Sequence, residues 1–318
     1  MNKNIDYNKI LLDLISIRKK FKSYAGSEGV AYFVSDKYVL KEYTKIVEWD
    51  EFDKFFNLYC SEVQSFANRG LNVAKIYSWV KIPNIGFYTS GDKNKNSYFI
   101  LEERVKGREL YTGYLEDAYA LASDLCSVEE FESAIKNERF DDLYREIIKR
   151  YLSDYIEMNE FLDGLSDAEL LRFLESAYSM YKDGVVSYPD LFPHNILVND
   201  NQMRMIDMHI KSVDDVLDLN DLDSAFIRDV LSLFLYNSFP NMPEKYLKDR
   251  KFDYSEFESY SKKNRELTKR LIARFFAMSG SICGGAEMNR KDKSTSLDVL
   301  HMMFGREVLG VTKQIGIE

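Results

Sequence analysis

Asp190, Asn195 and Asp207 lie within one short segment, from Ser187 to Asp207. Asp190 and Asn195 belong to the pattern D-L-x-x-x-N-I-L-V, and Asp207 follows Asn195 by twelve residues. Transfer of a phosphoryl group requires a carboxylate that orients and deprotonates the attacking hydroxyl, and oxygen ligands that hold Mg²⁺ on the phosphates. We therefore predict that Asp190 is a catalytic base and that Asn195 and Asp207 are metal ligands.

The residues between Asn195 and Asp207 favour a hairpin. Two mostly apolar runs, 196–198 and 203–206, flank the polar tetrapeptide Asn-Asp-Asn-Gln. A tight turn at this tetrapeptide would bring Asn195 and Asp207 close together, so that one metal ion could bridge them. An ordinary hairpin that follows a polar loop is the alternative interpretation.

The motif resembles the aminoglycoside phosphotransferase and choline kinase branch of the protein-kinase-like superfamily, and the resemblance covers roughly residues 20–240. It implies an α+β, two-lobed protein-kinase-like fold with ATP and Mg²⁺ as cofactors. The first lobe would be a small antiparallel sheet with one long helix, and the second lobe would be mainly helical. Two departures stand out: Tyr188-Pro189 replaces the usual histidine or arginine before the catalytic aspartate, and Met208-His209 follows Asp207.

The resemblance also assigns residues to the nucleotide. Gly26, Ser27 and Gly29 lie between two predicted strands, where the family has its phosphate-covering loop. Glycines allow backbone amides to approach phosphate oxygens, although a plain hairpin turn is the alternative. Lys41 resembles the lysine that neutralises the α and β phosphates. The nearest rivals for that role are Lys37 and Lys45.

In the family, a glutamate on a helix pairs with this lysine. Glu62 is the predicted partner of Lys41, because it shares a helix face with Tyr59 and Phe66 that points toward the sheet. A buried carboxylate needs a cation. Glu51 is the alternative partner, and a place on a partly exposed rim is the alternative interpretation of Glu62.

The segment from Ile100 to Gly107 resembles the L-x-E-x-x-x-G linker of aminoglycoside phosphotransferases. By this match, the Glu103 carbonyl and the Val105 amide would bind the edge of adenine. Glu102 would then occupy a position that is usually apolar, which leaves the register open by one residue. A simple strand end is the alternative interpretation of this segment.

The elements that must position these residues are short strands followed by helices. Alternating β-branched and aromatic residues predict strands within 22–43, at 73–81 and at 98–104, and a helical pattern over 49–69 ends at Gly70. The N-terminal leucines and isoleucines predict a leading helix. Beyond Gly107 helices are predicted at about 127–137, 142–163, 167–182, 222–237, 255–278 and 296–306. We therefore predict a nucleotide-binding lobe at 1–106 and a helical lobe with the catalytic loop at 107–318.

The 43 basic and 52 acidic residues give a formal net charge of −9, which disfavours binding to nucleic acid. A small cationic hydroxyl acceptor would suit this charge, although solubility alone also explains it. The acids at positions 214, 215, 218, 221 and 223 either bind such an acceptor or cap helices.

Three widely spaced cysteines without a C-x-x-C motif indicate neither a disulfide framework nor a zinc site, and a reducing, cytoplasmic compartment is expected. The apolar stretch 230–236 is too short to span a bilayer. A protein kinase is a rival function, but 208–220 is short for an activation loop and no A-P-E follows. A catalytically weak pseudokinase that acts as a nucleotide-binding module is the other rival.

Overall fold

The computed structural model describes residues 5–25, 29–43, 49–83, 96–110, 153, 155–199, 202–210, 222–234, 258–284, 290–304 and 308–315. The chain divides into two compact units. The first comprises Met1–Arg108, Ser176–Asp190 and Leu197–Leu219, and the second comprises Glu109–Glu175, Leu191–Ile196 and Asn220–Glu318. The first unit thus includes two segments that lie beyond the predicted lobe boundary between residues 106 and 107.

A five-stranded antiparallel sheet is the centre of the first unit. In spatial order its strands are β1 (Lys22–Ala25), β2 (Gly29–Phe33), β3 (Tyr38–Tyr43), β5 (Asn96–Glu103) and β4 (Ile76–Pro83). Successive side chains of a strand point to opposite faces. Because Lys41 pairs with Ile100 and Val39 pairs with Glu102, the side chains of Lys41 and Glu102 lie on the same face.

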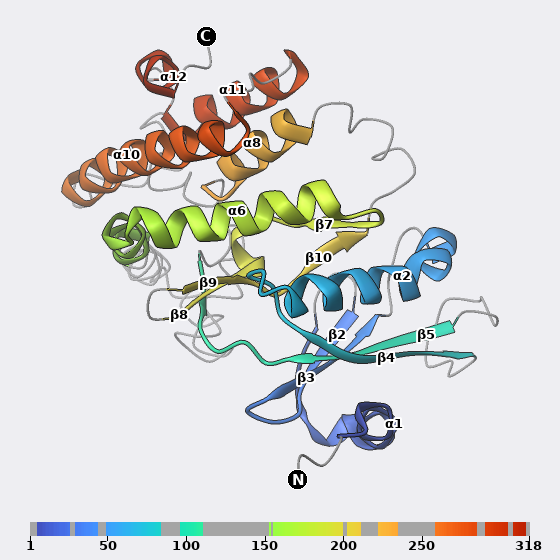
Figure 1. The fold of residues 1–318 in the computed structure, drawn as a ribbon. Helices are drawn as coiled ribbons and strands as arrows, with labels where there is room; N and C mark the ends of the chain where they lie inside the picture. Colours follow the sequence, from blue (N-terminus) through green and yellow to red (C-terminus); the bar gives the residue numbers. More distant parts are fainter. Residues whose placement is uncertain are drawn as a thin grey trace, which may run out of the picture. The chain divides into compact units, whose positions relative to one another are not determined.

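Helix α1 (Tyr7–Ile17) covers one face of this sheet, and the 3₁₀ turn η1 (Arg18–Lys20) continues it (Figure 1). The carboxylate of Asp6 caps the helix by accepting a hydrogen bond from the Lys9 amide at 3.1 Å. Leu11 and Ile15 are buried against the face that carries Leu40, Phe99 and Leu101. The apolar side chains of α1 therefore form a small core together with this face of the sheet.

Helix α2 (Trp49–Asn68) lies on the opposite face, where its aromatic side chains pack on the sheet (Figure 1). The rings of Phe52 and Phe56 lie 4.8 and 4.9 Å from that of Tyr98. The helix ends just before Gly70, whose φ of 82° is the left-handed conformation common at helix C-termini.

Two smaller sheets follow. β7 (Ser187–Pro189) pairs with β10 (Met208–Ile210), and the second sheet has the order β6 (Arg108–Glu109), β8 (Ile196–Asn199), β9 (Gln202–Met205). The 3₁₀ turn η3 (Pro193–Asn195) precedes β8. Because β8 and β9 are neighbours, the predicted hairpin is confirmed, and residues 200 and 201 of its turn lie outside the described residues.

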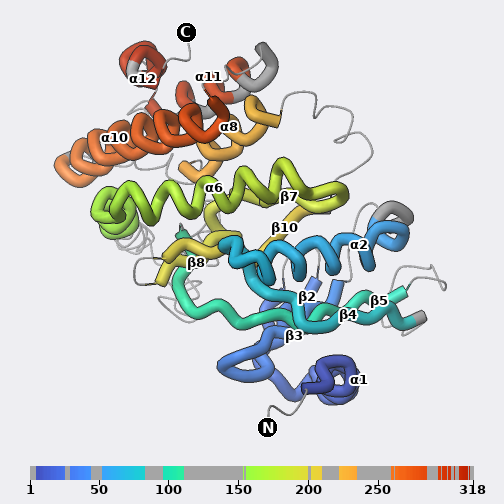
Figure 2. The backbone as a smooth tube through the Cα atoms, viewed as in Figure 1, coloured from blue at the N-terminus to red at the C-terminus, as the bar shows by residue number. Residues whose placement is uncertain are grey.

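The second unit is built from helices. α8 (Leu222–Ser232), α10 (Glu258–Ile282), α11 (Arg290–Phe304) and α12 (Val308–Ile315) pack on one another, and Figure 2 shows α8 beside α10 and α11. α6 (Asp167–Asp183) contributes residues to both units. Within the second unit the rings of Phe234 and Phe275 meet at 5.1 Å. No described helix is long and apolar enough to cross a membrane.

The structure confirms a mixed α+β chain with an antiparallel sheet and several helices. The two-lobed kinase-like arrangement stays a prediction. The strand predicted at 73–81 begins later, at Ile76, because Val73 makes an isolated bridge to Met205 instead. Helix α12 and the short strands β7 and β10 were not predicted. The helix predicted at 127–137 and most of 142–163 lie outside the described residues.

Candidate functional site

Asp190 and Asp207 flank the ribbon formed by β7 and β10. Asp190 directly follows β7, and Asp207 directly precedes β10. The antiparallel register pairs Pro189 with Met208. One further step of the same register would set Asp190 opposite Asp207, so the ribbon carries both predicted carboxylates at one end.

Lys41 lies on β3 and meets the residues just before the ribbon. Its Nζ donates a hydrogen bond to the Ile206 carbonyl oxygen at 2.6 Å. The same nitrogen lies 3.1 Å from Glu102 Oε2 and 3.7 Å from Asp207 Oδ1. The side chain of Asp207 is 39% exposed, whereas that of Glu102 is 8% exposed. One ammonium thus joins a buried carboxylate to an accessible one.

Burial and charge act against each other in this cluster. Burial, the largest influence, disfavours the charge on Lys41, but the carboxylates of Asp207 and Glu102 outweigh it, and the pKa of Lys41 is raised. Burial is also the largest influence on Glu102 and raises its pKa to about 7, although Lys41 acts in the opposite direction. Glu102 can therefore hold a proton near neutral pH, while Lys41 stays charged.

Glu62 has other partners than the expected Lys41. Its carboxylate accepts hydrogen bonds from the backbone amides of Val185, Val186 and Ser187, at 2.9 to 3.3 Å, and from the Ser187 hydroxyl at 2.8 Å. The expected Lys41–Glu62 pair is thus corrected to Lys41–Glu102, because β5 and not α2 brings a carboxylate to the lysine. The side chain of Glu51, the alternative partner, lies outside the described ones.

Sequence reasoning missed Glu102 and His209. Glu102 stood out only as an acid at a position that is usually apolar, and that anomaly was the available signal. His209 Nε2 lies 3.1 Å from Asp190 Oδ2, and its ring stacks on Tyr188 with the centroids 5.5 Å apart. The histidine therefore holds one oxygen of Asp190 in place, which the sequence did not indicate.

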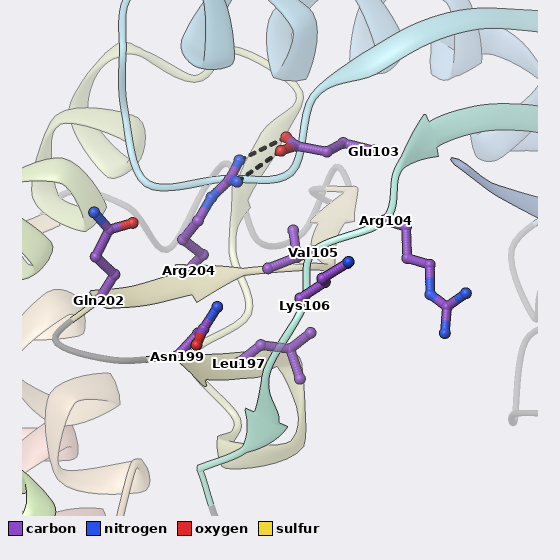
Figure 3. Close-up of a pocket in the computed structure, with 8 residues that line it drawn as sticks. All are labelled: Glu103, Arg104, Val105, Lys106, Leu197, Asn199, Gln202 and Arg204. Carbon is purple, nitrogen blue, oxygen red and sulfur yellow. Dashed lines mark hydrogen bonds and ion pairs between the residues drawn. The ribbon is translucent and has the colours of Figure 1, made fainter. Parts of the chain in front are cut away.

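The predicted adenine-binding segment runs along a cavity of about 230 Å³ (Figure 3). Arg204 of β9 makes a double hydrogen bond to the Glu103 carboxylate, at 2.7 and 2.8 Å, which fixes the end of β5. The Val105 amide makes no hydrogen bond to another described residue. Neither Lys41 nor Asp207 lines this cavity, so it is distinct from the Lys41 cluster. The lining residues are Glu103, Arg104, Val105, Lys106, Leu197, Asn199, Gln202 and Arg204.

Gly29 and Gly107 each lie so close to the backbone of another strand that a side chain would not fit. A Cβ at Gly107, whose φ is 153°, would lie 2.6 Å from the Val198 carbonyl oxygen. A Cβ at Gly29 would overlap the Glu42 carbonyl oxygen on the neighbouring strand. Both positions therefore require glycine for steric reasons. Gly26 and Ser27 of the predicted phosphate loop, and the rival Lys45, lie outside the described residues.

Asn195 belongs to the second unit, whereas Asp190 and Asp207 belong to the first. Asn195 is buried at the end of η3, where its backbone N–H donates a hydrogen bond to the Phe192 carbonyl oxygen at 2.9 Å. Among the described residues no group of three or more histidine, cysteine or acidic side chains forms a ready cation cage. Mg²⁺ does not need one, because it binds through one or two carboxylates together with substrate phosphates and water. The accessible carboxylate of Asp207 fits this demand.

No protein-family model matches the chain, and no curated protein matches it. Among solved structures it has a likeness to the choline kinase LicA from Streptococcus pneumoniae, with 12% sequence identity and a TM-score of 0.25. The likeness covers 93% of this chain and 99% of that chain. At this TM-score it supports no conclusion about the chain, whose function is inferred from its own residues.

Proposed function

We propose that the protein is an ATP-dependent phosphotransferase that transfers the γ-phosphate to a hydroxyl of a small, cationic molecule. One observation carries this proposal: Lys41 Nζ lies 3.7 Å from Asp207 Oδ1. Asp207 lies at the end of the β7–β10 ribbon that also carries Asp190. A cation for phosphate, a carboxylate for metal and a carboxylate for the attacking hydroxyl are the groups that phosphoryl transfer needs.

In this proposal Asp190 accepts the proton of the attacking hydroxyl. His209 Nε2 lies 3.1 Å from Asp190 Oδ2 and orients the carboxylate of this base. Lys41 binds the phosphates, Asp207 would hold Mg²⁺, and Asn195 stays a predicted metal ligand. When bound, Mg²⁺ neutralises charge on the phosphates.

The segment after β5 is proposed to hold the adenine, with the Glu103 carbonyl and the Val105 amide as its hydrogen-bonding groups. Support comes from the cavity that both residues line and from the Val105 amide, which has no described partner. Gly29, with Gly26 and Ser27, is proposed to cover the phosphates. The acceptor is proposed to be cationic because of the net charge of −9 and the acids at 214–223, of which all but Asp223 lie outside the described residues.

Two substitutions test this proposal by separating chemistry from binding. Asp190→Asn should leave ATP affinity nearly unchanged and lower turnover by on the order of a hundredfold or more, because a positioned base acts in the transition state. Asp207→Asn should weaken the Mg²⁺-dependent part of ATP binding. The measurements are ADP release with a panel of cationic, neutral and anionic hydroxyl acceptors, and the shift of the melting temperature by ATP with and without Mg²⁺.

The outcomes distinguish the proposed activity from its rivals. Full turnover in Asp190→Asn would overturn the assignment of the base. A melting shift by Mg²⁺ and ATP without transfer to any acceptor would favour a nucleotide-binding module. Absence of any shift at millimolar ATP would contradict nucleotide binding altogether. Preference for an anionic acceptor at both low and high salt would remove the cationic substrate and leave the phosphotransferase.

A further inference from the structure

Helix α2 binds the start of the strand that leads to Asp190. The Glu62 carboxylate accepts from three consecutive amides, those of Val185, Val186 and Ser187, and from the Ser187 hydroxyl. Consecutive amides that converge on one anion form a concave binding site. Ser187 is fully buried and is the first residue of β7. These hydrogen bonds to Glu62, called the Glu62 grip below, therefore fix β7 three residues before Asp190.

The turn held by Glu62 has little freedom to move on its own. The Gly184 amide donates to the Met180 carbonyl at 3.0 Å, which closes the C-terminal end of α6. A Cβ at Gly184 would lie 2.8 Å from that carbonyl oxygen and closer still to the carbonyl oxygen of Ser187. Residues 184–187 thus form a tight connection, and a carboxylate bound to its amides sets the direction in which β7 leaves it.

The same helix also binds the other strand of the ribbon. Tyr59, three residues before Glu62, donates its hydroxyl to the Met208 carbonyl oxygen at 3.1 Å. Residues three apart share one face of a helix. Met208 directly follows Asp207 and is the first residue of β10. One face of α2 therefore holds both strands, each within three residues of a predicted carboxylate.

We propose that Glu62 and Tyr59 are positioning residues through which α2 sets the placement of Asp190 and Asp207. This inference rests on the proposed phosphotransferase function, since it concerns the same two carboxylates. In this proposal α2 positions the two carboxylates, whereas the sequence predicted that its Glu62 would pair with Lys41. Lys41 is held by Glu102 and Asp207 without help from Glu62. A disturbance of the Glu62 grip should therefore act on turnover and leave ATP binding by Lys41 intact.

The experiment compares Glu62→Gln with Asp53→Asn, a matched control on the same helix. Asp53 also holds α2 through hydrogen bonds, but its partners are Lys81, Tyr98 and Asn96 of the large sheet. In Glu62→Gln one carbonyl oxygen replaces two carboxylate oxygens, and the new NH₂ group faces amide donors of the same polarity. We expect kcat to fall about tenfold or more while KM for ATP stays within about twofold.

Further variants make the expected pattern more specific. Glu62→Asp keeps the negative charge on a shorter side chain and should recover part of the lost kcat. Tyr59→Phe removes one hydrogen bond to β10 together with the hydrogen bond between the hydroxyls of Tyr59 and Tyr43, and it should have a smaller effect than Glu62→Gln. Asp53→Asn should lower the melting temperature without changing the ratio of kcat to KM for ATP. If Glu62→Gln raised KM for ATP and left kcat unchanged, the lysine-partner role would stand and the positioning role would be overturned.

Hydrogen exchange separates failure of this inference from failure of the proposed function. The amides of residues 185–188 and of Asp190 should exchange faster in Glu62→Gln than in the wild type and in Asp53→Asn, whether or not the protein transfers phosphate. Unchanged exchange of these amides in Glu62→Gln would overturn the proposal that α2 holds β7 through Glu62. A wild type that lacks transfer to every acceptor, but shows the expected exchange pattern, would overturn the phosphotransferase and retain the grip.

Discussion

Lys41 and Glu42 are neighbours on β3, and their side chains lie on opposite faces of the sheet. Glu42 is 4% exposed and accepts from Arg18 Nε at 2.9 Å, from Arg18 Nη2 at 3.2 Å and from the Tyr32 hydroxyl at 2.8 Å. Lys41 meets two carboxylates, of which Asp207 is 39% exposed. One strand therefore carries a closed ion pair on one face and an open cluster on the other.

The two faces differ in the balance of their charges. On the outer face, which α1 covers, one guanidinium meets one carboxylate, and the Tyr32 hydroxyl donates to the same carboxylate oxygen as Arg18 Nε. On the inner face Lys41 meets Glu102 and Asp207, so one negative charge is in excess when both acids are ionised. A proton on Glu102 or a second cation beside Asp207 removes the excess. The balanced pair is thus suited to stability and the unbalanced cluster to binding a cation.

The largest expected effect comes from removing the cation of the inner cluster. Lys41→Met should lower turnover by about a thousandfold, on the order of 4 kcal/mol of transition-state stabilisation, because phosphate charge loses its fixed partner. Turnover and ATP affinity are measured beside Lys37→Met, an exposed rival lysine on the loop before β3. If Lys37→Met and not Lys41→Met abolished activity, the assignment of the phosphate-binding lysine would pass to Lys37.

An effect on stability alone is expected on the outer face. Arg18→Met leaves Glu42 buried without its cation and should lower the free energy of unfolding by about 3 kcal/mol. Urea unfolding measures this loss, and Lys20→Met, on the same 3₁₀ turn but exposed, serves as the control. Turnover per folded molecule should stay near that of the wild type. A loss of turnover at full stability would show that the two faces are not separate in function.

The expected effect that is smallest per pH unit concerns Glu102. Because its pKa is raised from 4.5 to about 7, the folded state holds a proton that the unfolded state releases, and stability falls as pH rises through this window. Glu102→Gln should remove this fall, whose slope is at most about 1.4 kcal/mol per pH unit. Urea unfolding across the window measures it.

Glu103 provides a control of opposite sign for the pH experiment. Hydrogen bonds from Arg204, the largest influence, lower the pKa of Glu103, so its contribution to stability is present at neutral pH and is lost on acidification. Glu103→Gln should therefore remove a loss on the acid side and leave the fall between about pH 4.5 and about 7 in place. If Glu102→Gln paralleled the wild type across that window, the proton on Glu102 would be refuted.

Elements that depend on a local residue pattern could be predicted from the sequence. Alternation over 38–41 and helical spacing over 49–69 identified β3 and α2, and Gly70 marked the end of that helix. The partner that the sequence predicted for Lys41 was wrong. The face of Glu62 could be inferred from the helical period, but the choice between Lys41 and the amides of 185–187 depends on a chain separation of more than a hundred residues. The pairing of Lys41 with Glu102 follows from the register of β3 on β5, which local pattern does not encode.

Short strands were missed for a related reason. β7 and β10 have three residues each, too few for an alternation to stand out. Their pairing places Asp190 and Asp207 at one end of a ribbon, and this arrangement is visible only in the fold. The roles of Asp190, Asn195 and Asp207 as base and metal ligands stay predictions for the substitutions described above.

Cys60, which follows Tyr59 on α2, is fully buried, and burial, with a smaller influence from Glu102, raises the pKa of its thiol well above the ordinary value. An alkylating reagent needs an accessible thiolate, so it can modify Cys60 only when α2 separates from the sheet. Cys283, in the second unit, is partly exposed in the folded chain. The alkylation rate of Cys60 relative to Cys283 therefore measures how often α2 opens, without any new cysteine being introduced into the protein.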